Sequence, residues 1–210
     1  MSSTNQAAPE LGAVEVAGHT RSAFLVRGAL ATGSLYGAGA VGGFVTRAFG
    51  QSGAAGDLDI LNFALTLEYL EAAFYKEGLA KAGLSGDAKK LATEIHDHED
   101  QHVAALTQTI KKLGGKPVAA PKVAFPFTDQ ASFLKLAQVF EDTGVSAYNG
   151  AAPMISSKEV LGAAGSIVQV EARHAAAIRL LNGQNPSPAA FDPTLGKKQV
   201  LKAVKPFIKG

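Results

Sequence analysis

From Asp57 onward, the apolar positions of the chain recur every three or four residues, which is the spacing of an α-helix that buries one side. The first such stretch begins after Asp57, a residue type that caps helix N-termini, and ends near Gly83. The second stretch follows the polar turn at residues 85–87 and stops at Gly114, the first of two consecutive glycines. The pattern therefore predicts two long helices joined by a short turn.

A proline-rich stretch separates this helix pair from a second pair. Residues 116–128 contain three prolines and cannot continue a helix. A third helix is predicted from about Asp129, with Pro153 ending or kinking it. A fourth helix follows the capping-box sequence Ser-Ser-Lys-Glu at 156–159 and runs to Gly183. Four long helices with one long crossover between the second and the third predict an all-α four-helix bundle.

The two ends of the chain depart from this pattern. Residues 184–210 form a proline-containing tail, in which a short amphipathic helix is predicted at Lys197–Val204. We therefore divide the chain into an N-terminal segment at residues 1–56, a bundle at residues 57–183 and this tail.

The N-terminal segment resembles an export signal, in which a basic region precedes an apolar run and a small-x-small tripeptide. Two arginines come first, residues 28–46 carry no charge, and Ala48-Phe49-Gly50 follows. Residues 20–25 also look like a twin-arginine motif in which Ser22 replaces the second arginine. We expect export to the periplasm, the cell surface or the extracellular space. The alternatives are a retained membrane anchor and an extra helix packed on a cytoplasmic bundle.

Composition narrows the chemistry that the bundle can carry. The chain is 47% hydrophobic and 18% charged, with a formal net charge of +2, which is typical of a soluble globular protein and predicts no nucleic-acid partner. There are no cysteines, which excludes disulfides, thiolate catalysis, zinc ribbons and iron–sulfur clusters. Any metal site must therefore use histidine and carboxylate ligands.

Polar residues of a few kinds recur inside the apolar rows of the predicted helices. The motif Glu-x-x-His occurs twice, beginning at Glu99 and at Glu171. Each motif is preceded, about thirty residues earlier, by a glutamate that has a tyrosine seven positions after it. The two halves of the chain thus repeat one pattern, with Glu68, Tyr75, Glu99 and His102 in the first half and Glu141, Tyr148, Glu171 and His174 in the second.

The four glutamates and two histidines of this repeat are predicted to point into the bundle, since each lies between apolar residues of its helical row. Buried carboxylates cost several kcal/mol each unless positive charge compensates them. The chain supplies little such charge, because Arg173 faces away from its neighbour His174. Two divalent cations would balance four carboxylates, and the two imidazoles would add nitrogen ligands. The repeat therefore predicts a dinuclear metal site.

The position of each ligand on its helix suggests its role. Glu99 and Glu171 are the expected bridging carboxylates, because each shares a helix face with a histidine that can hold one metal ion. Glu68 and Glu141 are then terminal ligands. Glu71, one turn after Glu68, competes for the place on the first helix, but the repeat favours Glu68.

Four further residues near the predicted ligands have two interpretations each. Tyr75 and Tyr148 are either ordinary core tyrosines or hydrogen-bond partners of ligand carboxylates that donate an electron to the site. His96 and His98 are expected on the solvated surface of the second helix, although His98 lies one turn before His102 and can reach the edge of the site.

Residues 57–183 resemble a ferritin-like domain. The stretches NFALTLEYLEAAFY, FEDTGVSAYNGAAP and VEARHAAAIRLL are similar to a bacterial, plant and fungal group called desiccation-related or ferritin-like domain proteins. The resemblance covers about three-fifths of the chain and implies a ferritin-like four-helix bundle. It places that family's ligands on the same six residues, and implies two metal ions per chain, with iron preferred and manganese as the alternative.

Such a centre implies a reaction with dioxygen or peroxide. A di-iron centre would oxidise Fe(II) as ferroxidases do, and a di-manganese centre would detoxify peroxide as manganese catalases do. The alternative from another class is a non-enzymatic stress or desiccation-related protein, in which the metal ions hold the four helices together. The oligomeric state stays open, and contact with a membrane is expected only if the N-terminal segment is retained.

Overall fold

The computed structural model describes residues 15–16, 19–20 and 55–209, and the chain divides into two units, at residues 1–43 and 44–210. In the first unit, strand β1 (Glu15–Val16) pairs antiparallel with β2 (His19–Thr20). The apolar run on which the export prediction rests lies outside the described residues. Among the residues that are described, no helix has both the length and the apolar composition needed to cross a lipid bilayer.

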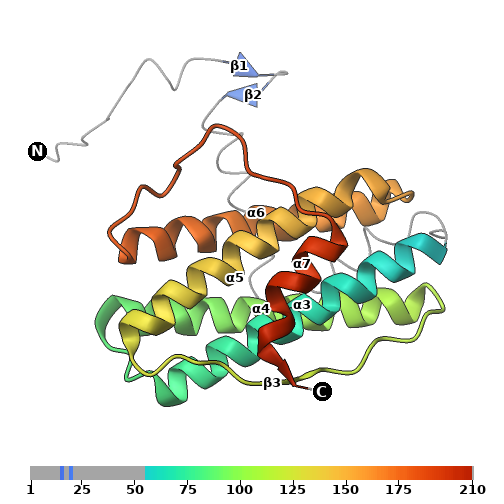
Figure 1. The fold of residues 1–210 in the computed structure, drawn as a ribbon. Coiled ribbons are helices and arrows are strands. Elements are labelled where there is room, and N and C mark those ends of the chain that lie inside the picture. Colours follow the sequence, from blue (N-terminus) through green and yellow to red (C-terminus); the bar gives the residue numbers. More distant parts are fainter. Residues whose placement is uncertain (1–14, 17–18, 21–54, 210) are drawn as a thin grey trace, which may run out of the picture. The chain divides into compact units, whose positions relative to one another are not determined.

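Four long helices make up the second unit, in the order α3 (Ala55–Lys81), α4 (Gly86–Lys112), α5 (Gln130–Ala151) and α6 (Lys158–Leu181). Helices α3 and α4 form one hairpin and α5 and α6 the other (Figure 1). The connection between α4 and α5 runs along the bundle, so that α5 starts at the opposite end from the one where α4 stops (Figure 1). The predicted all-α four-helix bundle with one long crossover is confirmed.

Glycines end two of these helices in the way that the sequence predicted. Gly114 after α4 and Gly183 after α6 have positive φ angles of 78° and 69°. In both cases the next amide bonds back into the last helical turn, from Gly115 to Ile110 O at 2.9 Å and from Gln184 to Arg179 O at 2.9 Å. These are Schellman motifs, which satisfy the terminal carbonyl groups of the helix.

The N-terminal ends of α3 and α6 differ from the prediction. Helix α3 begins at Ala55, so Asp57 lies in its first turn rather than at the N-cap. The buried carboxylate of Asp57 instead accepts hydrogen bonds from the amides of Ser156 and Ser157, at 2.8 and 2.9 Å. Helix α6 is capped by Ser157, whose hydroxyl accepts from the amide of Val160. The N-cap therefore lies one residue after Ser156, and the predicted capping box does not form, because Val160 at the third helical position has no side-chain acceptor. A contact between residues about one hundred positions apart fixes both ends.

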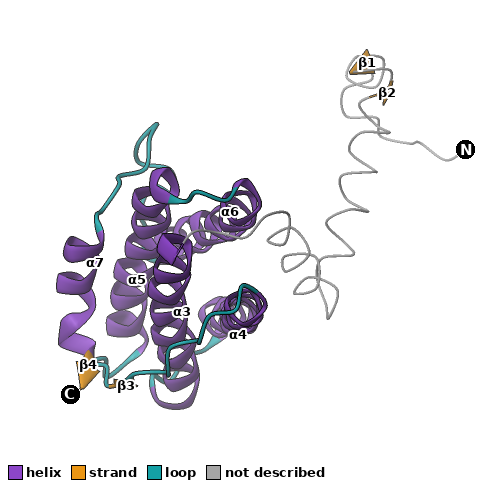
Figure 2. Cartoon of the chain, turned by 90° about the vertical axis from the view of Figure 1, so that its right-hand side faces the viewer, coloured by secondary structure: helices purple, strands orange, loops and turns teal. Residues whose placement is uncertain are grey.

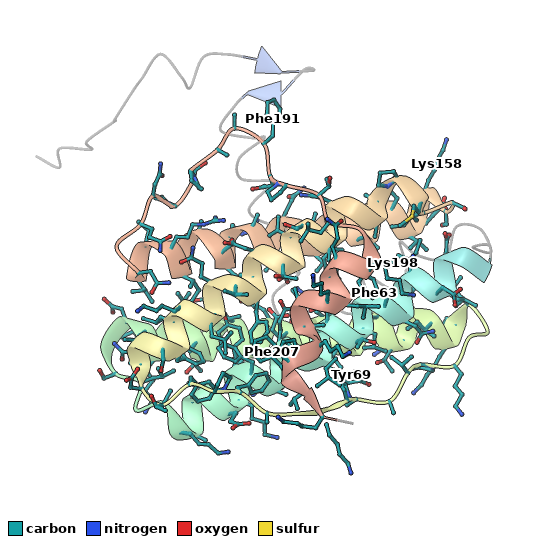
Figure 3. The ribbon with its side chains drawn as sticks, viewed as in Figure 1. Phe63, Tyr69, Lys158, Phe191, Lys198 and Phe207 are labelled. Carbon is teal, nitrogen blue, oxygen red and sulfur yellow. The ribbon has the colours of Figure 1, made fainter. Side chains whose placement is uncertain are left out.

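An aromatic cluster fills the core next to the polar residues of the repeat. Phe74 of α3 stacks on Phe133 of α5, with ring centroids 4.6 Å apart, and Tyr75 meets the edge of the same Phe133 ring. Phe207, labelled in Figure 3, packs against Phe140 with centroids 4.9 Å apart. This cluster gives the carboxylates an apolar, water-poor neighbourhood on one side.

The C-terminal tail closes the outer side of this cluster. Helix α7 (Lys197–Val204) buries Val200 and Val204 and lies across α5, on the side away from α4 (Figure 1, Figure 2). A short 3₁₀ turn (Lys205–Phe207) leads into β4 (Ile208–Lys209). Strand β4 pairs antiparallel with β3 (Lys122–Val123) in the crossover, which ties the tail to the bundle.

Candidate metal centre

Each of the four helices brings part of the repeat into the middle of the bundle. Glu68 comes from α3, Glu141 from α5, and the two Glu-x-x-His motifs come from α4 and α6. Within each motif the glutamate and the histidine are three residues apart, so one helical turn aims both side chains the same way. The structure therefore brings together all six predicted ligands, and the four glutamates are completely buried.

The imidazole of His102 is the centre of a first group. Its Nδ1 lies 3.2 Å from Oε2 of Glu68, 3.2 Å from Oε2 of Glu99 and 3.1 Å from Oε1 of Glu171. Oxygen and nitrogen atoms of these four residues lie within 4.8 Å of one another. Three helices thus supply one compact set of three carboxylates and one imidazole.

A second group forms around His174. Its Nδ1 lies 3.2 Å from Oε1 of Glu99 and 3.3 Å from Oε2 of Glu141, and these three residues also have donor atoms within 4.8 Å of one another. Glu99 belongs to both groups, with Oε2 facing His102 and Oε1 facing His174. It therefore has the geometry of a bridging carboxylate, whereas Glu171 lies in the first group.

The two tyrosines of the repeat cross between the two halves of the bundle. Tyr75 of α3 donates its hydroxyl hydrogen to Oε1 of Glu141 on α5, and Tyr148 of α5 donates to Oε1 of Glu68 on α3. In both glutamates the other oxygen, Oε2, faces a histidine Nδ1. The hydrogen-bonding interpretation of the tyrosines is therefore the one that the structure contains, and a role in electron transfer stays a prediction.

Several buried polar atoms of the cluster have no hydrogen-bond partner among the described residues. They are Glu99 Oε1, Glu141 Oε2, Glu171 Oε1 and Oε2, and His174 Nδ1. Buried polar atoms without partners cost free energy, and native structures contain few of them. All five atoms belong to residues of the two groups around His102 and His174. A cation with oxygen and nitrogen ligands there would satisfy them together.

Burial and mutual repulsion shift the proton affinities of the glutamates. Burial raises the pKa of Glu68 to about 7, although the neighbouring His102 opposes the shift. Burial, and then the charge of Glu99, raises the pKa of Glu171 well above its usual range. Burial acts on Glu99 in the same direction, but the charges and hydrogen bonds of His102 and His174 outweigh it and lower the pKa of Glu99 below its usual range. Without cations, the cluster therefore keeps protons that the same groups would lose in water.

The same burial and neighbouring charges shift the pKa values of the histidines and tyrosines. Burial opposes protonation of His102 and His174, yet nearby carboxylates, Glu99 for the former and Glu141 for the latter, raise the pKa of both well above the usual range. Burial, followed by the acceptor glutamate of each, raises the pKa of Tyr75 well above that of a free phenol, and Tyr148 behaves likewise. Both phenols therefore remain hydrogen-bond donors at neutral pH.

Glu71 is a fifth buried carboxylate beside the site. It is 3% exposed, and burial, followed by the charge of Glu171, raises the pKa of Glu71 well above its usual range. Its equivalent in the repeat is Gly144, and a side-chain carbon at Gly144 would lie 3.1 Å from Oε1 of Glu71 and 3.3 Å from Oε2 of Glu171. The missing side chain therefore makes room for Glu71. The repeat favoured Glu68 over Glu71 as the ligand on the first helix, but it did not predict that Glu71 lies against Gly144.

His98 also lies at the site, which the expectation of a solvated surface missed. Its Nδ1 lies 2.9 Å from Nε2 of His174, and the two rings are nearly parallel, with centroids 5.2 Å apart. His96 has a different environment, since its nearest acidic partner is Asp100, at 4.0 Å. Helical periodicity places His98 one turn before His102, whereas its contact with His174 depends on how α4 and α6 pack.

Comparisons with known proteins identify the fold. Residues 56–184 match the family described as Ferritin-like domain. Protein rds1 of Schizosaccharomyces pombe is 25% identical over 162 residues, which are 73% of this chain and 40% of that protein, so the chain spans about two-fifths of the length of this curated relative. The crystal structure of the conserved hypothetical protein rv2844 from Mycobacterium tuberculosis superposes with a TM-score of 0.57 at 17% identity, covering 65% of this chain and 97% of that one.

Proposed function

Because the chain belongs to the ferritin-like domain family, we propose that it binds two metal ions between its four helices and reacts with dioxygen or peroxide. One ion would lie in the group of Glu68, Glu99, His102 and Glu171, and the other in the group of Glu99, Glu141 and His174. Glu99 would bridge the two ions. Carboxylate and imidazole ligands suit both iron and manganese. We take iron as the preferred metal and manganese as the alternative.

The observation that carries this proposal is the set of unpaired, buried polar atoms that three helices contribute to the two groups. A network built only for packing would pair these atoms with one another, because each unpaired atom costs about 1–3 kcal/mol. Among the described residues, neither oxygen of Glu171 has a hydrogen bond, although Oε1 lies 3.1 Å from Nδ1 of His102. His174 Nδ1 and Glu99 Oε1 likewise have none, although they lie 3.2 Å apart. That arrangement suits cations better than direct hydrogen bonds.

The charge balance supports two ions rather than one. The two groups contain four carboxylates, and two divalent cations would neutralise them. Glu71 adds a fifth carboxyl group beside the groups, and burial, followed by the charge of Glu171, raises the pKa of Glu71 and favours its neutral form. A single divalent ion would leave two buried negative charges uncompensated.

The residues around the groups would prepare them for a redox reaction. Two adjacent iron or manganese ions, when bound, supply the two electrons that reduction of peroxide consumes. Tyr75 and Tyr148 hold one oxygen of Glu141 and Glu68 respectively, which leaves the second oxygen of each for a metal ion. Reduction of peroxide to water also consumes protons, and burial, followed by the charge of Glu171, raises the pKa of Glu71 and so favours a proton on this carboxyl group.

A small apolar pocket lies beside Tyr148. It has a volume of about 20 Å³ and residues of all four helices line it, among them Leu61, Leu67 and Leu106. That volume is close to the space one water-sized molecule occupies. Dioxygen and hydrogen peroxide would fit a space of this size.

Metal loading followed by turnover tests the proposal. The metal-free chain is titrated with Fe(II) under argon and with Mn(II), and each loaded form is then mixed with dioxygen or hydrogen peroxide. We expect about two ions per chain and repeated turnover with one of the metals. The control replaces Glu99, His102, Glu171 and His174 together by alanine and should bind neither metal at these sites.

The same experiment separates the enzyme from a purely structural role. Two bound ions that raise the melting temperature but give no steady-state turnover would favour the non-enzymatic stress protein. Equal metal binding by the fourfold alanine variant would overturn the site itself.

A further inference from the structure

His174 presents its two ring nitrogens to two different environments. Nδ1 faces the oxygens of Glu99 and Glu141, at 3.2 and 3.3 Å. Nε2 faces away from the carboxylates and lies 2.9 Å from Nδ1 of His98 on α4. His174 is therefore held between the carboxylate cluster and a second imidazole.

The geometry fixes which nitrogen must carry the proton when His174 binds a metal. A neutral imidazole has one nitrogen with a hydrogen and one with a lone pair, and only the lone pair can bind a metal ion. If Nδ1 of His174 binds the ion, Nε2 must carry the hydrogen and donate it. Nδ1 of His98 is then the acceptor, so the hydrogen of a neutral His98 must be on its own Nε2.

The contact between His98 and His174 has no counterpart at the equivalent position of the repeat. Glu99 corresponds to Glu171, so the residue equivalent to His98 is Val170, whose side chain has no hydrogen-bonding atom. His102 in the first group therefore gains no equivalent partner from that position. The two groups, which contain three and two carboxylates, therefore also differ in how their histidines are supported.

On this basis we propose that His98 is a positioning residue, which holds His174 in its metal-binding tautomer and makes the two metal positions unequal. The inference rests on the proposed function, because it concerns the same site. A hydrogen-bonded partner of a ligand histidine fixes the ring orientation and raises the basicity of the ligand, and its loss costs about 10–100-fold in metal affinity. Loss of His98 should therefore weaken the metal position at His174 and spare the one at His102.

The test uses Co(II) as the probe and measures two binding constants by calorimetric titration, with the visible absorption of Co(II) as a second signal. His98→Phe keeps a flat ring but removes the acceptor, and should weaken one of the two constants by about 10–100-fold. His98→Asn places an amide oxygen near the position of Nδ1 and should restore most of that loss. His96→Phe is the matched control, since it alters a histidine two residues away that faces Asp100, and should leave both constants unchanged.

A second set of variants identifies the affected position. In a His174→Ala background, adding His98→Phe should change nothing further, whereas in a His102→Ala background it should still weaken the remaining ion. Equal weakening of both positions, or equal loss in His98→Phe and His98→Asn, would overturn the proposal, because either result indicates a general packing role.

One measurement on the unaltered protein does not depend on the stability of any variant. With Zn(II) bound, nitrogen NMR of the histidine rings should show a hydrogen on Nε2 of both His174 and His98. A hydrogen on Nδ1 of neutral His98 would overturn the inference. A wild-type chain that binds no Co(II) would overturn the proposed function and this inference together, whereas two constants unaffected by His98→Phe would overturn this inference alone.

Discussion

The phenol of Tyr75 on α3 donates a hydrogen bond to Glu141 on α5, across the axis that separates the two halves of the bundle. The equivalent residues of the repeat make the same hydrogen bond in the opposite direction, from Tyr148 on α5 to Glu68 on α3. Each tyrosine therefore supports the glutamate of the other half rather than its own. The crossing couples the two hairpins at the level of the carboxylates, where the proposed ions would lie.

Replacing either tyrosine by phenylalanine should weaken metal binding without unfolding the bundle. A hydrogen bond to a charged acceptor is worth about 1.5–3 kcal/mol, so Tyr75→Phe and Tyr148→Phe should each lower affinity roughly tenfold or more. Tyr69→Phe is the control, because Tyr69 lies on the same helix, is only partly buried, and is labelled in Figure 3. Titration with Co(II) measures the effect, and unchanged affinity in both core variants would contradict the positioning role.

Glu68 and Glu71 offer a matched pair on one helix. Both are buried, but only Glu68 contributes an oxygen to the group around His102. Glu68→Gln should reduce the metal content from about two ions to about one, whereas Glu71→Gln should retain both, because Glu71 contributes no oxygen to either group and an amide has nearly the shape of a carboxyl. Elemental analysis of both variants, loaded identically, checks this. The reverse result would move the site on α3 by one turn.

Gly144 should be intolerant of a side chain that other helical glycines accept. Alanine normally stabilises a helix interior by roughly 1 kcal/mol relative to glycine. At Gly144 the added carbon would crowd Glu71 and Glu171, so Gly144→Ala should weaken metal binding. Combining it with Glu71→Ala should recover binding, since the space is then free.

The control for this prediction is Gly162→Ala on α6, where an added carbon would meet no atom within 4 Å. It should raise the melting temperature slightly and leave metal binding unchanged. Equal behaviour of Gly144→Ala and Gly162→Ala would show that the space opposite Glu71 has no role.

The metal-free protein should lose stability as the pH rises. Burial raises the pKa of Glu68 to about 7 and that of Glu171 well above its usual range. A group whose pKa is raised by folding stabilises the fold while it is protonated, and this stabilisation disappears as the pH rises through the folded pKa. For Glu68 alone it is on the order of 3 kcal/mol. The melting temperature of the metal-free chain should therefore fall between about pH 5 and pH 8.

Bound metal should reverse this trend, because ions displace the protons and their affinity rises with pH. The gap in melting temperature between loaded and metal-free protein should widen from pH 5 to pH 8. Glu68→Gln should show a shallower decline in the metal-free form. A metal-free melting temperature that increases over this range would contradict the account.

The six residues of the two groups could be predicted because helical periodicity and the internal repeat both act locally. Glu99 and His102 share a helix face whatever the rest of the fold does, and the same holds for Glu171 and His174. The crossover between the second and third helices could be predicted from local sequence too, because the prolines at residues 116–128 exclude a helix there. For these features, short-range geometry was sufficient.

The features that escaped prediction depend on how the helices cross. His98 meets His174 only because α4 and α6 pack at a particular height and angle. Gly144, the equivalent of Glu71 in the repeat, has no side chain and so leaves room for that carboxylate. Asp57 binds the start of α6 instead of capping its own helix. Each case joins residues far apart in the chain, and no local pattern encodes such a contact.

Anomalous diffraction from crystals loaded with iron or manganese tests the central claim most directly. We expect two anomalous peaks in each chain, one among Glu68, Glu99, His102 and Glu171 and the other among Glu99, Glu141 and His174, with Glu99 contacting both. A fully loaded crystal with no peak inside the bundle, or with peaks held by other residues, would contradict it.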